Sequence, residues 1–388
     1  MHSTRYLIVG GGMTGDAAAK GIREHDADGR ITLVGVEPHA PYKRPPLTKG
    51  LWSGGDEAKI WRGTADAGVE LRLGRRIVTI DLEARRATDD QGEEYSWAKL
   101  LLATGGRPRE LPAAGAVVYF RTLDDYHRLR AQAGEGARAV VIGGGFIGSE
   151  LAASLTGAGC RVTMVFPGTG IASRILPGEL SAFVAGYYRE RGIEVLTEET
   201  VRAVESAGSG AAVHTGSGRT LEADVVVAGL GIEPNTALAL AAGLRVEDGI
   251  VVDEYGRAGG REDVFAAGDV ASFPVLALGR RLRVEHEDHA NTHGKTVGAN
   301  MAGAEIPYDH IPFFYSDMFD LGYEAVGDVD SRLRTLARWE EPNRKGIVAY
   351  VDEAQVPRGF LFWNTWDKVD AGRDLIRAAQ PIDEAMLV

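Results

Sequence analysis

The sequence predicts an α/β protein with parallel sheets, and three observations support that prediction. Two glycine fingerprints of the form G-x-G-x-x-G occur in one chain, at residues 10–15 and 143–148. Each follows an apolar run, at residues 6–9 or 139–142, and therefore stands at a strand-to-helix turn. Strand and helix signals also alternate along most of the chain. The expected fold is two Rossmann-like dinucleotide-binding domains, one of them discontinuous, plus an α+β C-terminal domain.

The glycines of each fingerprint have separate physical tasks. The first permits a tight turn, the second lets the backbone approach a pyrophosphate, and the third lets the helix pack on its strand. The pyrophosphate then lies at the helix N-terminus. Two such sites indicate that one bound nucleotide exchanges electrons with another. The residues expected to bind are Gly10, Gly12, Met13, Thr14 and Gly15 in the first fingerprint, and Gly143, Gly145, Phe146, Ile147 and Gly148 in the second.

The elements that follow the first fingerprint fit a βαβ unit. A helix is expected around residues 17–20 and a second strand at 31–34, ending near Glu37. An acidic side chain at that strand end is placed to bind ribose hydroxyls. Further strands are expected near residues 69–81 and at 100–103.

The second unit begins with a polar helix after Arg121. Strands are expected at residues 161–166, 225–228 and 264–269, followed by a helix at 288–301. From about residue 307 the pattern mixes strands with a terminal helix. The two glycine-rich units resemble each other over about thirty residues, which indicates an internal duplication.

Composition limits the classes of function. The 388 residues carry 55 acidic and 43 basic side chains, a net charge of -12, which argues against a nucleic-acid partner. Cys160 is the only cysteine, so an intramolecular disulfide is excluded and a reducing compartment is favoured. No apolar run approaches the ~18 residues that span a bilayer. The first strand is expected within a few residues of Met1, with no signal peptide. A cytoplasmic location without a membrane span is therefore expected.

Two similar turns follow the ends of strands in the two units. Thr104 lies in the first turn and Gly231 in the second, and glycines in each let the backbone pass close to a cofactor. Asp269 offers a carboxylate at another strand end, suited to a polyol hydroxyl. Each feature alone also fits an ordinary turn. Their order along the chain, interleaved with the fingerprints, favours cofactor binding.

That order resembles the two-dinucleotide flavoprotein reductases of the glutathione-reductase-like fold over nearly the whole chain. The resemblance implies that the first fingerprint holds FAD, the second holds NADH or NADPH, and Asp269 binds the flavin ribityl chain. It also implies the domain boundaries: residues 1–109 and 233–305 form the FAD-binding domain, residues 110–232 the NAD(P)-binding domain, and residues 306–388 the C-terminal α+β domain.

Residues 41–49 narrow the resemblance to the apoptosis-inducing factor and ferredoxin reductase branch. They look like its RPPLSK-type loop, at the place where disulfide reductases carry redox cysteines. The resemblance implies that Arg44 contacts FAD and that Lys49 lies beside flavin N5, paired with Glu150. An ammonium there stabilises the negative charge that arrives with a hydride. A paired carboxylate keeps the lysine protonated. Lys49 and Glu150 are therefore the expected catalytic residues.

The same branch implies further flavin and nicotinamide contacts. Arg121 has the spacing of an FAD-binding arginine, and Val78 is expected to approach the adenine through its backbone. Phe146 is expected to flank the nicotinamide.

Residues 284–290 read Val-Glu-His-Glu-Asp-His-Ala and allow two interpretations. His286, His289 and His293 have helical spacing for a metal, but the pattern is not HExxH and no cysteine assists, so no metal is expected. The resemblance instead implies a helix N-terminus facing the flavin, whose dipole stabilises the reduced ring. On that interpretation Glu285 and His286 line the nicotinamide side and Glu287 touches the flavin edge.

Aromatic segments near the C-terminus resemble the same branch. Tyr315 stands where the branch usually has tryptophan and is expected to contact the isoalloxazine. Glu324 and Asn364 are expected on the NAD(P) side. Plain core packing is the alternative for the aromatic residues.

The choice of nicotinamide is open in the sequence. Gly168 stands where the branch has a glutamate that accepts from the NADH ribose and repels a 2′-phosphate. Arg174 suits either a ribose or a phosphate. NADH is favoured, with NADPH as the alternative.

The resemblance implies an FAD-dependent NAD(P)H:acceptor oxidoreductase that transfers hydride to flavin N5, without a redox-active disulfide. The acceptor is expected to be a ferredoxin, a rubredoxin, a quinone or oxygen, and a homodimer is possible. The alternative is a redox-gated interaction protein with slow NADH oxidation and NADH-dependent dimerisation.

Overall fold

The computed structural model describes residues 2–112 and 115–387 of the chain. They divide into two compact units. The first unit comprises Met1–Lys43, Glu57–Arg107 and Glu233–Phe313, and the second comprises Arg44–Asp56, Pro108–Ile232 and Phe314–Val388. The chain passes between the two units after residues 43, 56, 107, 232 and 313. The finer division into domains stays a prediction.

The first unit is built on a seven-stranded sheet in the order β3-β2-β1-β6-β5-β4, with β19 beside β6. Strands β1, β2, β3, β6 and β19 pair in parallel, whereas β4 and β5 are antiparallel. The central strands are buried, as expected for a sheet covered on both faces. The bounds are β1 His2–Val9, β2 Ile31–Gly35, β3 Val69–Leu73, β4 Ile77–Asp81, β5 Arg86–Asp89, β6 Glu94–Leu102 and β19 Val264–Ala266.

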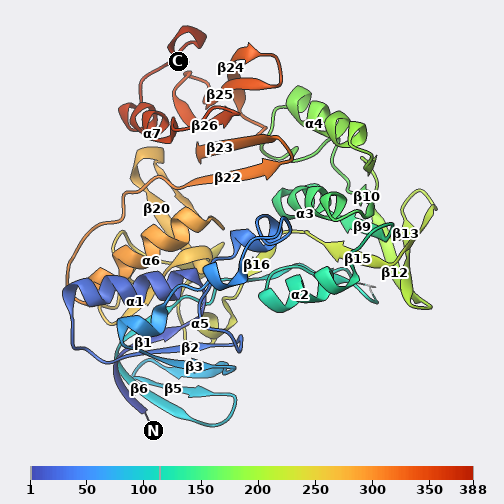
Figure 1. Cartoon of the computed structure of the whole chain (residues 1–388). Helices are drawn as coiled ribbons and strands as arrows, with labels where there is room; N and C mark the ends of the chain where they lie inside the picture. The colour runs from blue at the N-terminus through green and yellow to red at the C-terminus, as the bar shows by residue number, and fades with distance from the viewer. Residues whose placement is uncertain (1, 113–114, 388) are drawn as a thin grey trace. The chain divides into compact units, whose positions relative to one another are not determined.

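Helices α1 (Met13–His25) and α6 (Glu287–Met301) run side by side in this unit (Figure 1). A Cβ atom on Gly298 would overlap the carbonyl oxygen of Ala18, so glycine lets the two backbones touch. The remaining elements are α5 Ala237–Ala241 and a four-stranded sheet of β17 Val246–Glu247, β18 Gly249–Val251, β20 Ala271–Val275 and β21 Arg280–Leu282.

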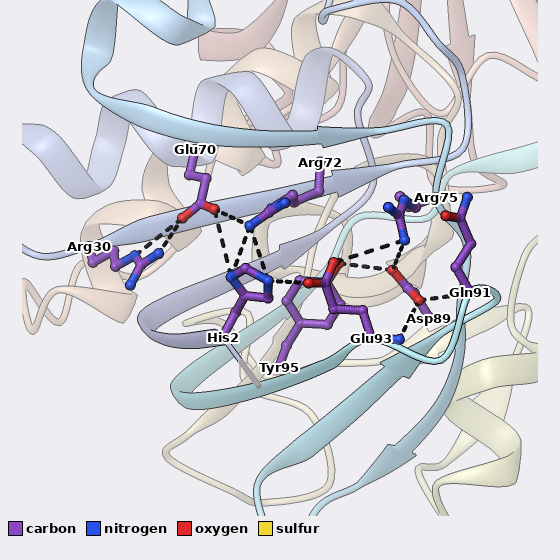
Figure 2. A network of polar contacts seen from close by, with 9 residues as sticks. All are labelled: His2, Arg30, Glu70, Arg72, Arg75, Asp89, Gln91, Glu93 and Tyr95. Carbon is purple, nitrogen blue, oxygen red and sulfur yellow. Dashed lines mark hydrogen bonds and ion pairs between the residues drawn. The ribbon is translucent and has the colours of Figure 1, made fainter.

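A network of ion pairs and hydrogen bonds ties the strands of the first sheet together (Figure 2). Asp89, which is buried, accepts from the hydroxyl of Tyr95 at 2.9 Å and pairs with Arg75 at 3.2 Å. Arg72 pairs with Glu70 at 2.7 Å. The bond between Asp89 and Tyr95 therefore joins β5 to β6 through side chains as well as through the backbone.

The second unit contains a five-stranded parallel sheet in the order β11-β10-β9-β15-β8. Its core combines buried residues of β9, β10 and β15 with the neighbouring antiparallel sheet. The bounds are β8 Val118–Tyr119, β9 Arg138–Ile142, β10 Arg161–Val165, β11 Glu194–Leu196, β15 Val225–Ala228, α2 Leu123–Gln132, α3 Phe146–Gly157 and α4 Gly178–Glu190, with the small sheet β12 Val201–Ala207, β13 Gly210–Thr215 and β14 Thr220–Ala223.

The C-terminal part forms an antiparallel sheet followed by a helix. Its order is β22-β23-β26-β25-β24. The bounds are β22 Phe313–Met318, β23 Leu321–Gly327, β24 Arg334–Glu341, β25 Lys345–Val351, β26 Pro357–Trp363 and α7 Val369–Ala378. Outside this sheet, β7 Gly106–Pro108 and β16 Ile232–Pro234 form a separate two-stranded sheet. The α/β fold with two Rossmann-like sheets and a C-terminal sheet is thus confirmed. Among the described residues, no helix is long and apolar enough to cross a bilayer.

Candidate functional site

The first fingerprint forms a tight turn between β1 and α1. Gly10 has a φ of +133°, and a Cβ atom there would overlap the carbonyl oxygen of Ala103. A Cβ on Gly15 would overlap the carbonyl oxygen of Gly10. A Cβ on Gly12, by contrast, would meet nothing within 4 Å. The protein needs the outer two glycines for its own packing, whereas Gly12 leaves open space at the start of a helix.

The second fingerprint repeats this geometry between β9 and α3. A Cβ on Gly143 would overlap the carbonyl oxygen of Gly229, and one on Gly148 would overlap that of Gly143. Gly145 again faces open space within 4 Å. Neither helix has a side-chain cap, so the N–H groups of the first turn remain for an anion. Both turns therefore fit a dinucleotide pyrophosphate.

Other predicted residues gather at the same edge of the first sheet. Strands β1, β6 and β19 end in register at Val9, Leu102 and Ala266. The turn after β19 carries Asp269, and a Cβ on its neighbour Gly268 would overlap the hydroxyl of Thr14.

The turn after β6 carries Thr104, whose hydroxyl donates to the carbonyl of Asn235 at 2.9 Å. The side-chain amide of Asn235 returns a bond of 2.9 Å to the carbonyl of Thr104. These paired bonds fix the turn beside Gly10, since a Cβ on Gly10 would lie 3.2 Å from the backbone nitrogen of Thr104.

Two further residues that are predicted to contact FAD, Glu37 and Val78, lie at different parts of the first sheet. Glu37 follows β2 and accepts from the hydroxyl of Tyr42 at 2.5 Å. Val78 is exposed on β4, an edge strand that three strands separate from β2 in the sheet order. The structure does not bring these two side chains together, and the role of Val78 stays a prediction.

The start of α6 carries the predicted nicotinamide-side residues of the first unit. His286 is the N-cap, and Glu287 and Asp288 are acidic residues of the first turn. Burial lowers the pKa of His286 to about 4, although Asp269 and Asp288 act in the opposite direction. The imidazole is therefore neutral at physiological pH. Glu285 pairs with Arg283 at 2.7 Å.

His289 and His293 lie further along α6 and pack together, with ring centroids 4.7 Å apart. His289 shares a hydrogen bond of 3.0 Å with the hydroxyl of Tyr308, and His293 accepts from the N–H of Gly268 at 3.3 Å. Burial lowers the pKa of both imidazoles, that of His293 to about 3. No cluster of three or more potential metal ligands occurs in the part of the chain that the structure describes. The sequence did not reveal that His293 supports the turn of Asp269.

The second unit contains the predicted lysine–carboxylate pair. Lys49 ends the short turn Pro45–Thr48, and its Nζ lies 3.3 Å from Oε1 of Glu150 on α3. Both side chains are largely buried. The pairing agrees with the expectation from the sequence, whereas the catalytic roles of the two residues stay predictions.

Two hydroxyls complete the surroundings of Glu150. Thr48 donates to one carboxylate oxygen at 2.6 Å, and Ser316 donates to the other at 2.7 Å. Burial raises the pKa of Glu150, although Lys49 and the two hydroxyls act in the opposite direction. The site thus holds a carboxylate in a poorly solvated place, with the ammonium of Lys49 and two hydroxyls turned toward it.

Lys49 has two further neighbours on β22. Its Nζ lies 3.9 Å from the centre of the Tyr315 ring and 3.1 Å from a carboxylate oxygen of Asp317. Sequence reasoning missed Thr48, Ser316 and Asp317 as partners. Their only signal was position: Thr48 precedes Lys49, and the other two follow Tyr315.

Arg44 and Arg121, predicted to bind FAD, also lie in the second unit. The guanidinium of Arg44 donates to the backbone carbonyl of Arg121 at 2.7 Å. The predicted FAD residues are thus shared between the units: Arg44, Lys49, Arg121 and Tyr315 belong to the second, and the others belong to the first.

The remaining predicted NAD(P) residues of the second unit lie in separate places. Phe146 begins α3 and packs edge-on against Phe314, with centroids 5.2 Å apart. Gly231 has a φ of +82° and faces open space. Glu324 accepts from the N–H of Asp367 at 3.2 Å, and burial raises its pKa.

Asn364 joins neighbouring main-chain segments of the C-terminal sheet. Its side chain accepts from the N–H of Gly322 at 2.7 Å and donates to the carbonyl of Arg344 at 2.8 Å. These bonds give Asn364 a structural task, and its contact with NAD(P) stays a prediction.

Comparisons with known proteins agree with this geometry. Residues 4–294 match the family described as pyridine nucleotide-disulphide oxidoreductase, and residues 297–344 match the C-terminal domain of mitochondrion-associated apoptosis-inducing factor. The chain is 38% identical to the ferredoxin–NAD(+) reductase component of an anthranilate 1,2-dioxygenase system of Burkholderia cepacia, over 87% of this chain and 85% of that protein.

Two other relatives cover almost all of this chain. Mitochondrial apoptosis-inducing factor 1 of Dictyostelium discoideum is 31% identical over 98% of this chain and 79% of that protein. The reductase in a crystal structure of the covalent putidaredoxin reductase–putidaredoxin complex superposes with a TM-score of 0.92 and 30% identity, over 100% of this chain and 96% of that chain.

Proposed function

The chain belongs to the pyridine nucleotide-disulphide oxidoreductase family and is an FAD-dependent NAD(P)H oxidoreductase, and from that premise we propose that it delivers electrons to a small ferredoxin-type protein. The open space beside Gly12 and beside Gly145 in one chain supports the binding of two dinucleotides, and the relatives support the protein acceptor. Cys160 is the only cysteine, so the electrons do not pass through a disulfide of this chain.

FAD, when bound, supplies a ring that accepts a hydride from NAD(P)H and passes electrons onward. Thr14 and Asp269 are proposed to hold its phosphate and ribityl groups, and Glu37 its ribose. Lys49 provides a fixed positive charge for the isoalloxazine. Glu150 orients Lys49 and is itself oriented by the hydroxyls of Thr48 and Ser316.

The protein acceptor is proposed from the relatives. One relative is named a ferredoxin reductase component, and one structural neighbour is a complex with putidaredoxin. Rubredoxin, a quinone and oxygen are the other acceptors to be tested. A homodimer and a cytoplasmic location complete the proposal; the single cysteine supports the latter.

The test is an anaerobic titration of the purified holoprotein with NADH, followed by addition of an oxidised ferredoxin. We expect the flavin absorbance to bleach with NADH and to return as the ferredoxin is reduced. Bleaching that reverses only with a quinone or oxygen would reject the ferredoxin acceptor. A protein that binds no flavin would reject the function itself.

A second candidate is the redox-gated interaction protein, which the match of residues 297–344 favours. In that case turnover is slow with every acceptor, and NADH shifts the protein from monomer to dimer. Sedimentation of the holoprotein with and without NADH under anaerobic conditions distinguishes the two candidates.

A further inference from the structure

The two units are built alike after their second strands, and the likeness identifies corresponding residues. In the first unit, the carbonyl of Gly35 accepts from the N–H of Arg75 at 2.9 Å. The carbonyl of Glu37 accepts from the N–H of Gly74 at 3.0 Å. The chain thus leaves β2 with a defined pair of backbone bonds, and Glu37 is the second residue after the strand ends.

The second unit repeats both bonds. The carbonyl of Phe166 accepts from the N–H of Glu199 at 3.1 Å, and the carbonyl of Gly168 accepts from the N–H of Glu198 at 3.0 Å. Phe166 therefore corresponds to Gly35 of the first unit. Gly168 corresponds to Glu37.

The glycine fingerprints give the same correspondence independently. A Cβ on Gly11 would lie 3.2 Å from Cα of Gly35, and a Cβ on Gly144 would lie 2.7 Å from the ring of Phe166. The second residue of each fingerprint thus faces the corresponding position at the end of the second strand: Gly11 faces Gly35, and Gly144 faces Phe166.

The correspondence means that the second unit lacks the ribose-binding carboxylate. An acidic side chain at this place accepts from the 2′-hydroxyl of NADH and repels the 2′-phosphate of NADPH. No aspartate or glutamate occurs from Phe166 to Ile175. This loop therefore contains no charge that opposes a phosphate.

The same loop presents a hydroxyl and a cation instead. The loop folds back on the fingerprint, because the N–H of Ala172 donates to the carbonyl of Gly144 at 2.7 Å. The hydroxyl of Ser173 would lie 2.7 Å from a Cβ on Gly168. Arg174 is exposed, and its guanidinium makes no ion pair or side-chain hydrogen bond with the described residues.

We propose that the second unit accepts NADPH as well as NADH, with the 2′-phosphate bound by the hydroxyl of Ser173 and the guanidinium of Arg174. Guanidinium and hydroxyl groups are the donors that suit a phosphate. The proposal rests on the proposed function and specifies its electron donor.

Two carboxylates stand across from the loop. That of Glu199 is already held by the N–H of Ser217 at 3.0 Å and by the hydroxyl of the same residue. Glu198 is exposed beside Gly168 and is a negative charge near the proposed phosphate. Asp330 precedes Ser331, which bonds to the backbone of Arg174, and its carboxylate is held by Arg332 at 2.9 Å. Glu198→Gln is therefore expected to favour NADPH relative to NADH.

The decisive variants are Gly168→Glu and its matched control Gly168→Gln. Both crowd Ser173 equally, so their difference isolates the charge. We expect Gly168→Glu to lower the ratio of kcat/KM for NADPH to that for NADH by about ten-fold or more relative to Gly168→Gln. Arg174→Ala is expected to reduce the NADPH value more than the NADH value.

A binding measurement provides a readout that does not depend on turnover. Titration calorimetry of the holoprotein is expected to give tighter binding for 2′,5′-ADP than for 5′-AMP, and Arg174→Ala is expected to remove that preference. Equal binding of the two probes, with flavin reduction by NADH alone, would overturn this inference and leave the proposed function intact. Failure of both nucleotides to reduce the flavin would instead contradict the proposed function.

Discussion

The ammonium of Lys49 has three partners in the second unit. It contacts a buried carboxylate, an exposed carboxylate and the face of Tyr315. These contacts hold its ammonium in one place in a poorly solvated part of the second unit. A charge fixed in this way needs little reorganisation when negative charge arrives at a bound flavin.

We predict that Lys49→Met slows flavin reduction by NADH about 100-fold while FAD stays bound, because the variant removes the fixed charge. Stopped-flow absorbance under anaerobic conditions measures the rate. Lys43→Met, at an exposed lysine of the same loop, is the control and is expected to be unchanged. Equal rates of flavin reduction in the two variants would contradict a role of Lys49 in hydride transfer.

Glu150 makes a testable contribution to the pH dependence of stability. Because its pKa is raised in the folded protein, ionisation costs stability as the pH rises above the ordinary value of 4.5. Glu150→Gln removes that cost. The Tm of the natural protein minus that of Glu150→Gln should therefore fall with rising pH and level off above the raised pKa. A difference that is constant from pH 4 to 8 would contradict the assignment.

At the scale of elements, each strand–turn–helix unit separates packing glycines from a binding glycine. Gly148 touches its own loop, whereas Gly145 faces open space. The same division recurs at Gly15 and Gly12. Duplication of a βαβ unit explains why both turns show it.

The division predicts opposite effects of two neighbouring substitutions. Gly148→Ala must displace the loop and is expected to destabilise the protein by about 1–3 kcal/mol. Gly145→Ala is expected to keep the Tm and to weaken NADH binding, because the methyl group enters the open cradle. Thermal unfolding and NADH titration of both variants check this. Weak binding without any loss of stability in both would show that Gly148 is not a packing residue.

At the scale of the whole molecule, we expect stability toward acid to depend on the network of the first sheet (Figure 2). Burial alone would raise the pKa of Asp89. Hydrogen bonds from the N–H of Glu93 and the hydroxyl of Tyr95, with the charge of Arg75, instead hold it below its ordinary value. The pKa of Glu70 is also lowered: burial opposes this, and the hydrogen bonds and charges of Arg30 and Arg72 outweigh it.

A carboxylate with a lowered pKa stabilises the fold above its ordinary pKa of 3.8, and that contribution is lost as the pH falls below it. We predict that Asp89→Asn costs about 1–3 kcal/mol at pH 7 and that the cost shrinks toward pH 3. Urea unfolding at a series of pH values measures it. Glu94→Gln, at an exposed carboxylate of the same sheet, should cost nothing at any pH.

The sequence by itself determined the class of fold, the two nucleotide cradles and the absence of a redox disulfide. These features depend on local pattern: a glycine after an apolar strand has the same consequence wherever the unit is placed. The pairing of Lys49 with Glu150 was also expected, although only through the resemblance to a family.

Tertiary structure decided the features that join distant segments. Ser316 reaches Glu150 across 166 residues, and His293 supports Gly268 from a different element. Sequence spacing carries no information about such contacts, because packing of separate elements brings them together. The correspondence of Gly168 with Glu37 likewise required the backbone bonds of both units. Those bonds join residues that are far apart in the sequence. They identify the position at which the second unit lacks a carboxylate, and the hypothesis about the electron donor depends on that position.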